Sequence, residues 1–179
     1  MSTYQPPLQD IRFALFDVLG SEAVFSTLGF ADASRDTVEA VLDESARFCS
    51  TVLAPLNAVG DRQGAQYDKA TGDVATSPGF KEAYQQFVEG GWGGISAPAE
   101  FGGLGLPHAL GMPLEEMINA ANLAWGNFPL LSHGAANALR LHGEDWQREV
   151  FLKPLIAGEW TGTMCLTEPH CGTDLGLLK

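Results

Sequence analysis

Apolar residues recur at helical spacing in several separate stretches of this chain. Between Asp36 and Ala54 they return every three or four residues, which is the period of one helix face. The segment 77–91 shows the same spacing between a Ser-Pro start and a Gly-Gly end. The pattern predicts further helices over 10–19, 108–124, 129–142 and 144–157. A mainly α fold is therefore expected.

Proline and glycine mark the expected ends of these helices. Pro55 is expected to end the helix that starts near Asp36, because proline removes a backbone donor and clashes with the preceding turn. Asn57–Thr76, rich in glycine and aspartate, is then expected to be an exposed loop. A break near Gly126–Pro129 is expected to separate two of the buried helices.

The pattern changes after Gly158. Residues 160–167 have the residue types and the alternation of a β-strand, but the sequence offers no second strand to pair with it. A lone strand leaves its own backbone N–H and C=O groups unsatisfied. We therefore expect this segment either to be frayed or to pair with chain beyond Lys179, which suggests a truncated protein.

The net charge of the chain limits the kinds of molecule that it is expected to bind. The 179 residues include 22 Asp and Glu against 10 Lys and Arg, a formal net charge of −12. This balance would repel a phosphate backbone or an anionic membrane surface, and the sequence has no basic cluster to offset it. Nucleic acid and membrane are therefore not expected as partners. A small anionic ligand remains compatible, because such sites use local N–H groups rather than net charge.

One stretch requires a choice between a membrane span and buried helices. Met117–Leu139 contains no charged residue and is long enough to cross a bilayer. It also contains Pro129 and several asparagines, which the core of a bilayer disfavours. Two buried helices are therefore the expected structure of this stretch.

The cysteines and the chain start bear on the cellular compartment. Three cysteines without paired spacing argue against a disulfide framework, so a reducing, cytoplasmic setting is the simplest interpretation. Met1–Leu8 has no basic region followed by an apolar run, and no signal peptide is expected. The four histidines have none of the spacings typical of zinc ligands, so no metal is expected.

The stretch LTEPHCGTD, residues 166–174, offers the clearest candidate chemistry. Thr167 and Thr173 supply hydroxyls, and Gly172 permits close approach of a ligand to the backbone N–H groups around it. Hydroxyl and amide donors of this kind suit a flavin edge or a pyrophosphate. The same stretch also fits a simple capped turn in which Thr173 and Asp174 bond local amides. Both interpretations stay open on the residues alone.

Three motifs in order make the chain resemble the acyl-CoA dehydrogenase family. Residues 91–107 read GWGGISAPAEFGGLGLP, similar to the family's exit from its second helix. Residues 141–169 read LHGEDWQREVFLKPLIAGEWTGTMCLTEP, similar to a later family helix and the strand after it. Residues 162–176 read GTMCLTEPHCGTDLG, similar to the family's first signature. The lead-in over 4–19 resembles a branch with long subunits that includes 3-methylmercaptopropionyl-CoA dehydrogenases.

This resemblance implies a three-part architecture of an N-terminal helical domain, a middle β domain and a C-terminal four-helix bundle. The chain would begin with an extension bearing a short helix, residues 1–35. The helical domain would follow over 36–159, and residues 160–179 would supply the start of the middle β domain, including its first strand. The chain would then be an N-terminal fragment that stops inside a flavin site.

The resemblance also implies the chemistry, which is α,β-desaturation of an acyl-CoA thioester with FAD as cofactor. A carboxylate removes the α-proton, and the β-hydrogen leaves as hydride to the flavin. Met164, Leu166 and Thr167 would contact the flavin ring, while Gly172 and Thr173 would face the FAD pyrophosphate or the mouth of the CoA channel. The family's catalytic Glu belongs to a later part of the chain, so no catalytic residue is expected here and the chain would be inactive alone.

Substrate and partners follow from the same resemblance. The helix from Phe128 to His133 would help to wall the pocket of an acyl-CoA such as 3-methylmercaptopropionyl-CoA, with Thr173 at its mouth. The complete enzyme would pass electrons to an electron-transfer flavoprotein and form a homodimer or homotetramer. Two rivals stay open: a stand-alone helical binding module, and an acyl-CoA oxidase-like relative that keeps the same motifs.

Overall fold

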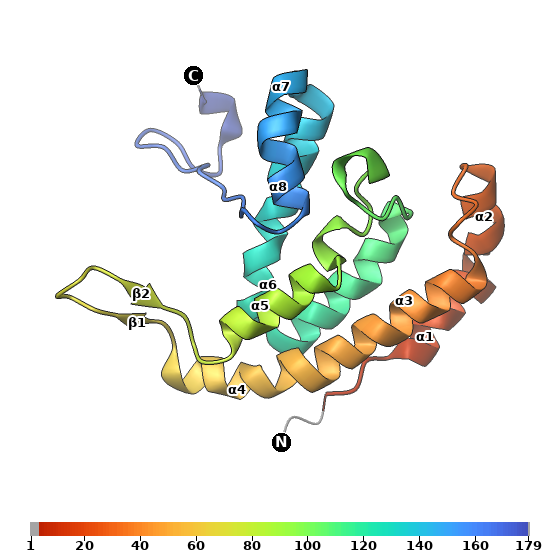
Figure 1. The fold of residues 1–179 in the computed structure, drawn as a ribbon, viewed down its shortest axis with the longest axis horizontal. Helices are drawn as coiled ribbons and strands as arrows, with labels where there is room; N and C mark the ends of the chain where they lie inside the picture. Colours follow the sequence, from red (N-terminus) through yellow and green to blue (C-terminus); the bar gives the residue numbers. More distant parts are fainter. Residues whose placement is uncertain (1–3, 179) are drawn as a thin grey trace.

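The computed structural model describes residues 4–178 of the chain. The N-terminal part contains α1 (Leu8–Arg12), which runs directly into one stretch of π-helix, η1 (Phe13–Val18), and then α2 (Ser21–Thr27) (Figure 1). The helix predicted over 10–19 is therefore confirmed. The part of the chain-start prediction that falls on residues 1–3 lies outside the described residues.

The longest early helix does not end at proline. It runs through α3 (Arg35–Phe48), the π-helical η2 (Cys49–Leu53) and α4 (Ala54–Gln63) without interruption. The prediction that Pro55 ends this helix is wrong. The wider π-helical turn immediately before the proline offers a physical reason, since widening relieves the ring's clash with the preceding turn.

The expected loop over 57–76 is only partly a loop. Its first residues extend α4, and two short strands follow, β1 (Gln66–Tyr67) and β2 (Val74–Ala75), paired antiparallel with Gln66 opposite Ala75. The hairpin projects from the bundle and its strands are exposed (Figure 1). At its base the Ser77 hydroxyl donates to the Gly64 carbonyl at 3.0 Å, which ties the two arms together.

The next helix follows the sequence expectation, and a glycine-rich connector comes after it. α5 (Phe80–Glu89) lies within the predicted 77–91 segment and ends before the two glycines. Three short 3-10 turns, η3 (Trp92–Gly94), η4 (Ala99–Phe101) and η5 (His108–Leu110), then carry the chain to the start of α6. The connector is thus a folded segment of tight turns rather than an open loop.

α6 (Gly111–His142) is a helical hairpin rather than one rod. Glu115 and His133 would lie about 27 Å apart along a straight helix, yet their side chains meet at 3.1 Å. The chain folds back at Asn122, whose backbone leaves helical geometry at φ −162° and ψ 87°. The predicted pair of helices is confirmed, but the break lies at Asn122, Pro129 sits inside the second half, and most residues of that half are exposed or only partly buried.

The side chain of Asn122 explains why the break falls there. Its Oδ1 accepts the Trp125 N–H at 3.1 Å, which is the bond of an N-cap for the second half of the helix. Its Nδ2 donates to the buried Leu53 carbonyl at 3.3 Å. Gly126 keeps the fold tight, because a Cβ there would lie 2.5 Å from Asn119 Oδ1. A single buried asparagine therefore caps one helix and links it to another.

The last helical stretch comprises α7 (Asp145–Gln147), η6 (Arg148–Leu152) and α8 (Lys153–Ile156), as predicted over 144–157. Within the described residues, no helix is both long and apolar enough to cross a membrane. The mainly helical fold class is confirmed.

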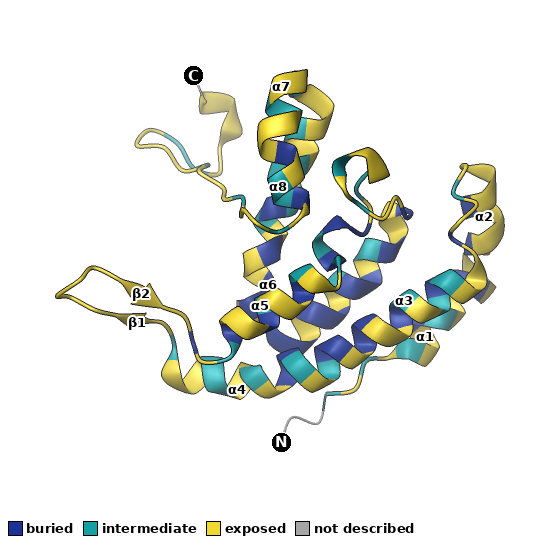
Figure 2. Ribbon diagram, viewed as in Figure 1, coloured by how far each residue is buried: buried dark blue, intermediate teal, exposed yellow. Residues whose placement is uncertain are grey.

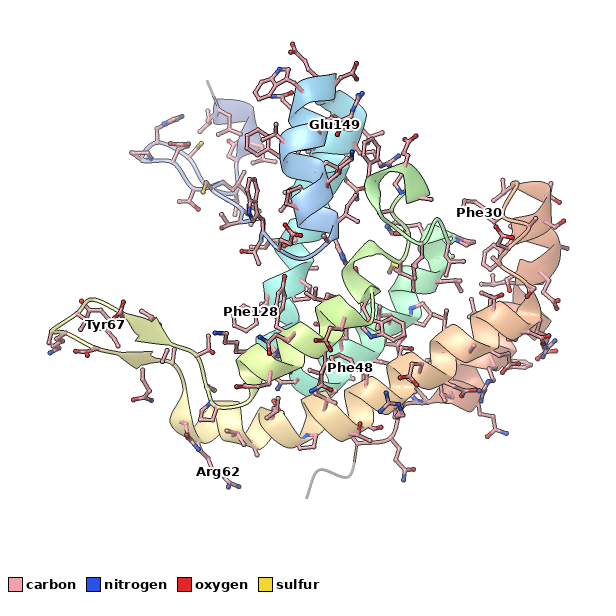
Figure 3. The ribbon with its side chains drawn as sticks, viewed as in Figure 1. Phe30, Phe48, Arg62, Tyr67, Phe128 and Glu149 are labelled. Carbon is pink, nitrogen blue, oxygen red and sulfur yellow. The ribbon has the colours of Figure 1, made fainter. Side chains whose placement is uncertain are left out.

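The core lies where α3 and α5 face the part of α6 on both sides of Asn122, and burial is concentrated there (Figure 2). At its centre the rings of Phe48 and Phe87 pack against Trp125 at centroid distances of 6.0 and 5.5 Å (Figure 3 labels Phe48). The Trp125 indole N–H donates to the Phe80 carbonyl at 3.2 Å, so its polar atom is satisfied inside the core. This core holds the two halves of α6 that line the sites described next.

Candidate functional site

The chain that follows α8 is anchored to the helical body at two points. The ring of Trp160 lies 6.0 Å from that of Phe151 on the preceding helix. Two residues later the Gly162 N–H donates to the Ser132 hydroxyl of α6 at 3.0 Å. These contacts fix where residues 163–174, which carry the Thr-Glu-Pro motif and are called the motif segment below, leave the helical body.

Beyond Gly162 the expected strand does not form. Residues 160–167 contain no β-strand, as the frayed alternative predicted, and the one pairing in the described residues after them is a bridge between Glu168 and Cys171. The Glu168 N–H donates to the Cys171 carbonyl at 2.8 Å, closing a tight turn. The physical reason is the one that makes any lone strand unstable: the described chain offers it no neighbouring strand.

The motif residues lie on this turn and are open to solvent. Met164 is 62% exposed, and Thr167 and Thr173 are exposed as well, whereas Leu166 and Gly172 are partly buried. The turn brings Gly172 next to Thr167: a Cβ at position 172 would meet only Thr167 Cγ2, at 4.0 Å. The backbone at Gly172 is therefore open to close approach, and the exposed Thr167 and Thr173 each carry a hydroxyl on the same turn.

Asp174 takes the local role that a capped turn predicts. Its Oδ1 accepts the Gly176 N–H at 3.1 Å, at the start of the short 3-10 helix η7 (Leu175–Leu177). The capped-turn interpretation is therefore correct for Asp174. It leaves Thr167 and Thr173 available, because the cap uses neither hydroxyl.

Phe128 lies beside the hairpin, away from the interior of the bundle (Figure 3). Its ring packs edge-on against Phe80 with the centroids 6.2 Å apart. Together with Thr161 and the β2 arm of the hairpin, it lines an open groove of ≈ 600 Å³. This groove ends at the anchored start of the motif segment.

His133 lines a different hollow. It faces Glu115 across the fold of α6, with Nδ1 3.1 Å from the carboxylate, inside a cavity of ≈ 290 Å³. The structure therefore does not bring Phe128 and His133 into one pocket, although five positions separate them on the same helix. Five residues turn a helix through about one and a half circuits, so the two side chains leave on opposite faces.

Sequence reasoning missed Ser132 and Thr161. Ser132 is buried and receives the Gly162 N–H, while Thr161 lines the groove beside Phe128. The sequence did contain a signal for Ser132, since a lone hydroxyl inside an apolar helical stretch usually has a hydrogen-bond partner when buried.

Within residues 4–178, no three His, Cys, Asp or Glu side chains are grouped to hold a metal ion.

Comparison with known proteins gives the family of this fold. A family model described as the acyl-CoA dehydrogenase N-terminal domain matches residues 35–159. The chain is 41% identical to 3-methylmercaptopropionyl-CoA dehydrogenase of Ruegeria pomeroyi over 99% of this chain and 30% of that protein. It superposes on butyryl-CoA dehydrogenase from Megasphaera elsdenii with a TM-score of 0.63 and 25% identity, over 78% of this chain and 34% of that one.

A further solved structure shares the fold at lower identity. It is an acyl-CoA dehydrogenase complexed with FAD from Bacillus anthracis, with a TM-score of 0.59 and 19% identity over 80% of this chain and 22% of that chain. The chain belongs to the acyl-CoA dehydrogenase family, as its three motifs indicate. It spans about 30% of the length of the curated relatives that match over nearly all of it.

Proposed function

We propose that this chain forms the N-terminal portion of an FAD-dependent acyl-CoA dehydrogenase, which desaturates the α,β bond of an acyl-CoA thioester. The observation that carries the proposal is the family match over 35–159, followed at once by an exposed turn bearing the Thr-Glu-Pro motif. In this proposal residues 1–35 are an extension, 36–159 the helical domain and 160–179 the start of a β domain.

The exposed turn is the proposed flavin contact. Met164 and Leu166 would pack on the flavin ring, with Thr167 donating a hydrogen bond to its edge. Gly172 and Thr173 would offer backbone and hydroxyl donors to the pyrophosphate or to the mouth of the CoA channel. FAD, when bound, supplies the hydride acceptor. What this chain adds is orientation and polar contact, which its anchored but solvent-open turn supports.

The proposed substrate, 3-methylmercaptopropionyl-CoA, is based on the groove lined by Phe128 and on the 41% identity to the Ruegeria pomeroyi protein. Phe128 and Thr161 line a groove that ends where the motif segment begins, which suits an acyl chain led toward the flavin. His133, on the other face of the helix, would support the wall of this groove from behind without lining it. A 41% identical 3-methylmercaptopropionyl-CoA dehydrogenase supports the same thioester as the substrate here. Thr173 would stand near the CoA moiety.

Partners of the complete enzyme are proposed on the family resemblance. The enzyme would pass its electrons to an electron-transfer flavoprotein and assemble as a homodimer or homotetramer. The catalytic Glu would come from a later part of the parent chain. This chain by itself is therefore expected to bind substrate and flavin weakly and to be inactive.

Activity tests the last point directly. The purified chain is mixed with FAD, an artificial electron acceptor and 3-methylmercaptopropionyl-CoA or butyryl-CoA, and acceptor reduction is followed. We expect no turnover above the protein-free rate. Turnover that depends on flavin would contradict the assignment of the catalytic Glu to missing chain.

Flavin binding tests the site itself. Flavin fluorescence anisotropy during titration with the chain should rise, and Thr167→Val should weaken the binding severalfold. Thr71→Val, at the exposed tip of the hairpin, is the matched control and should leave binding unchanged.

Reading the coding sequence past Lys179 distinguishes the dehydrogenase from the stand-alone binding module. A natural stop codon there would favour the binding module over the enzyme.

A further inference from the structure

The cavity around His133 is formed by the helical body alone and opens to solvent beside Arg140. The two halves of α6, the connector before it and α8 surround a space of ≈ 290 Å³. Much of its wall is apolar, formed by Phe87, Trp92, Leu114, Leu152 and Ile156, all of which are buried. Known ligand pockets of proteins start at about 300 Å³, so this cavity suits a small molecule.

One side of the cavity carries a polar stripe. His133, Asn137 and Arg140 follow one another at intervals of four and three residues, which places them on one face of the second half of α6. Glu115 and Asn119, also four apart, line the cavity from the first half. The fold at Asn122 therefore turns two polar faces toward each other around an otherwise apolar space.

Glu115 and Arg140 are the only Asp, Glu, Lys or Arg side chains among the described lining residues, and they do not pair with each other. The Glu115 carboxylate is engaged by His133 at 3.1 Å. Arg140 is the one Lys or Arg among the described lining residues, and within residues 4–178 no carboxylate lies in ion-pair range of its guanidinium. Arg140 and Asn137 are exposed, so the guanidinium stands at the open rim of the cavity with no carboxylate of the described chain paired to it. Guanidinium groups pair best with planar anions such as carboxylates.

We propose that this cavity binds a small monocarboxylate with an apolar tail. The carboxylate would pair with Arg140 and receive a hydrogen bond from the Asn137 side-chain amide one turn earlier. The tail would lie against Trp92 and Leu114. The site goes beyond the proposed dehydrogenase function, because its walls include none of the motif residues 164–173 and, of the residues proposed for the acyl-CoA site, only His133.

Three molecules of equal tail length test the proposal. Hexanoate, hexan-1-ol and hexylamine are titrated into the chain while the indole N–H resonance of Trp92 is followed by NMR. Hexanoate should shift this resonance saturably, and the alcohol should bind at least tenfold more weakly because it carries no charge. Equal binding of hexan-1-ol, or tighter binding of hexylamine, would overturn the proposal.

Two variants test separately where the carboxylate and the apolar tail of the ligand bind. Arg140→Gln should weaken hexanoate binding at least tenfold, while Arg62→Gln, an exposed arginine outside the cavity, should not (Figure 3 labels Arg62). Ala136→Leu should block binding by filling the cavity without changing charge. Circular dichroism checks that each variant folds. Unchanged hexanoate binding in folded Arg140→Gln would overturn the proposal, and because no flavin or CoA is used, the dehydrogenase function is tested separately.

Discussion

The Gly162 N–H donates to the Ser132 hydroxyl at 3.0 Å, across 30 residues of sequence, and this bond joins the motif segment to α6. The approach is close because position 162 has no side chain. A Cβ there would lie 2.7 Å from the Ala135 Cβ and 3.0 Å from the Ser132 Cα. The glycine at this position therefore decides where the candidate flavin turn starts.

Gly162→Ala should release the motif segment from the helical body. The added methyl cannot fit against α6, so the bond to Ser132 breaks, and the packing of Trp160 on Phe151 loosens with it. Limited proteolysis should cut after residue 160 several times faster than in the unchanged chain. Gly172→Ala is the matched control, since its Cβ would meet nothing closer than 4.0 Å. Equal cleavage of both variants would argue against the anchor.

Asn122→Ala should lower the free energy of unfolding by about 1–3 kcal/mol, because it removes an N-cap and a buried hydrogen bond to the Leu53 carbonyl. The residue is 1% exposed and bonds both Trp125 and Leu53. Urea unfolding followed by circular dichroism measures the change. Asn127→Ala, exposed on the same helix, should cost less than about 0.5 kcal/mol. A similar cost for both would mean that the fold of α6 does not depend on this side chain.

Burial raises the pKa of the Cys49 thiol to about 12 from an ordinary value of 9.0. In the native chain at pH 8, Cys49 should therefore resist iodoacetamide, while the exposed Cys165 reacts within minutes. Denaturant should make Cys49 reactive. Mass spectrometry of tryptic peptides distinguishes the two sites, and rapid native labelling of Cys49 would contradict its burial.

The same shift has a consequence for stability at alkaline pH. Between pH 9 and about 12 the unfolded thiol loses its proton while the folded thiol keeps it, so the unfolded state binds fewer protons. Cys49 therefore stabilises the fold fully below pH 9, and this contribution falls as pH rises through that window. Cys49→Ala should show a shallower alkaline decline in unfolding free energy than the unchanged chain, whereas Cys165→Ala should not.

Arg12 ties the N-terminal helix to α3. Its guanidinium lies 2.7 Å from Glu39 and 2.5 Å from Asp43, and all three side chains are at least partly exposed. Arg12→Gln should cost about 1 kcal/mol or less at low salt, with the difference shrinking in 1 M salt. Arg47→Gln is the control, because Arg47 pairs with Glu44 within its own helix. A cost for Arg12→Gln that salt does not change would point to packing rather than charge.

Much of the helical architecture followed from local patterns. The spacing of Val38, Leu42, Phe48 and Leu53 identified a buried face, and all four are buried in the structure. Such patterns work because one helix face must leave water wherever the helix packs. The Thr-Glu-Pro motif and its neighbours likewise indicated the family before any contact was known, which the family match confirmed.

Helix ends were harder to predict. Pro55 signalled a stop, yet a π-helical turn accommodates it and the helix continues to Gln63. The break in α6 was expected near Gly126–Pro129, but it lies at Asn122, where the side chain caps the new helix and bonds the Leu53 carbonyl. Residues 160–167 had a strand pattern but formed no strand, since pairing requires a partner that local sequence does not provide.

What the sequence determined by itself was most of the helices, the buried face of the helix that starts near Asp36, and the family of the chain. Only the tertiary structure decided that Phe128 and His133 face different hollows, and that Ser132 anchors Gly162. The physical reason is the separation along the sequence of the residues that interact. Periodicity and turn chemistry act between residues a few positions apart, whereas a cavity or an anchor depends on which distant surfaces the packed core brings together.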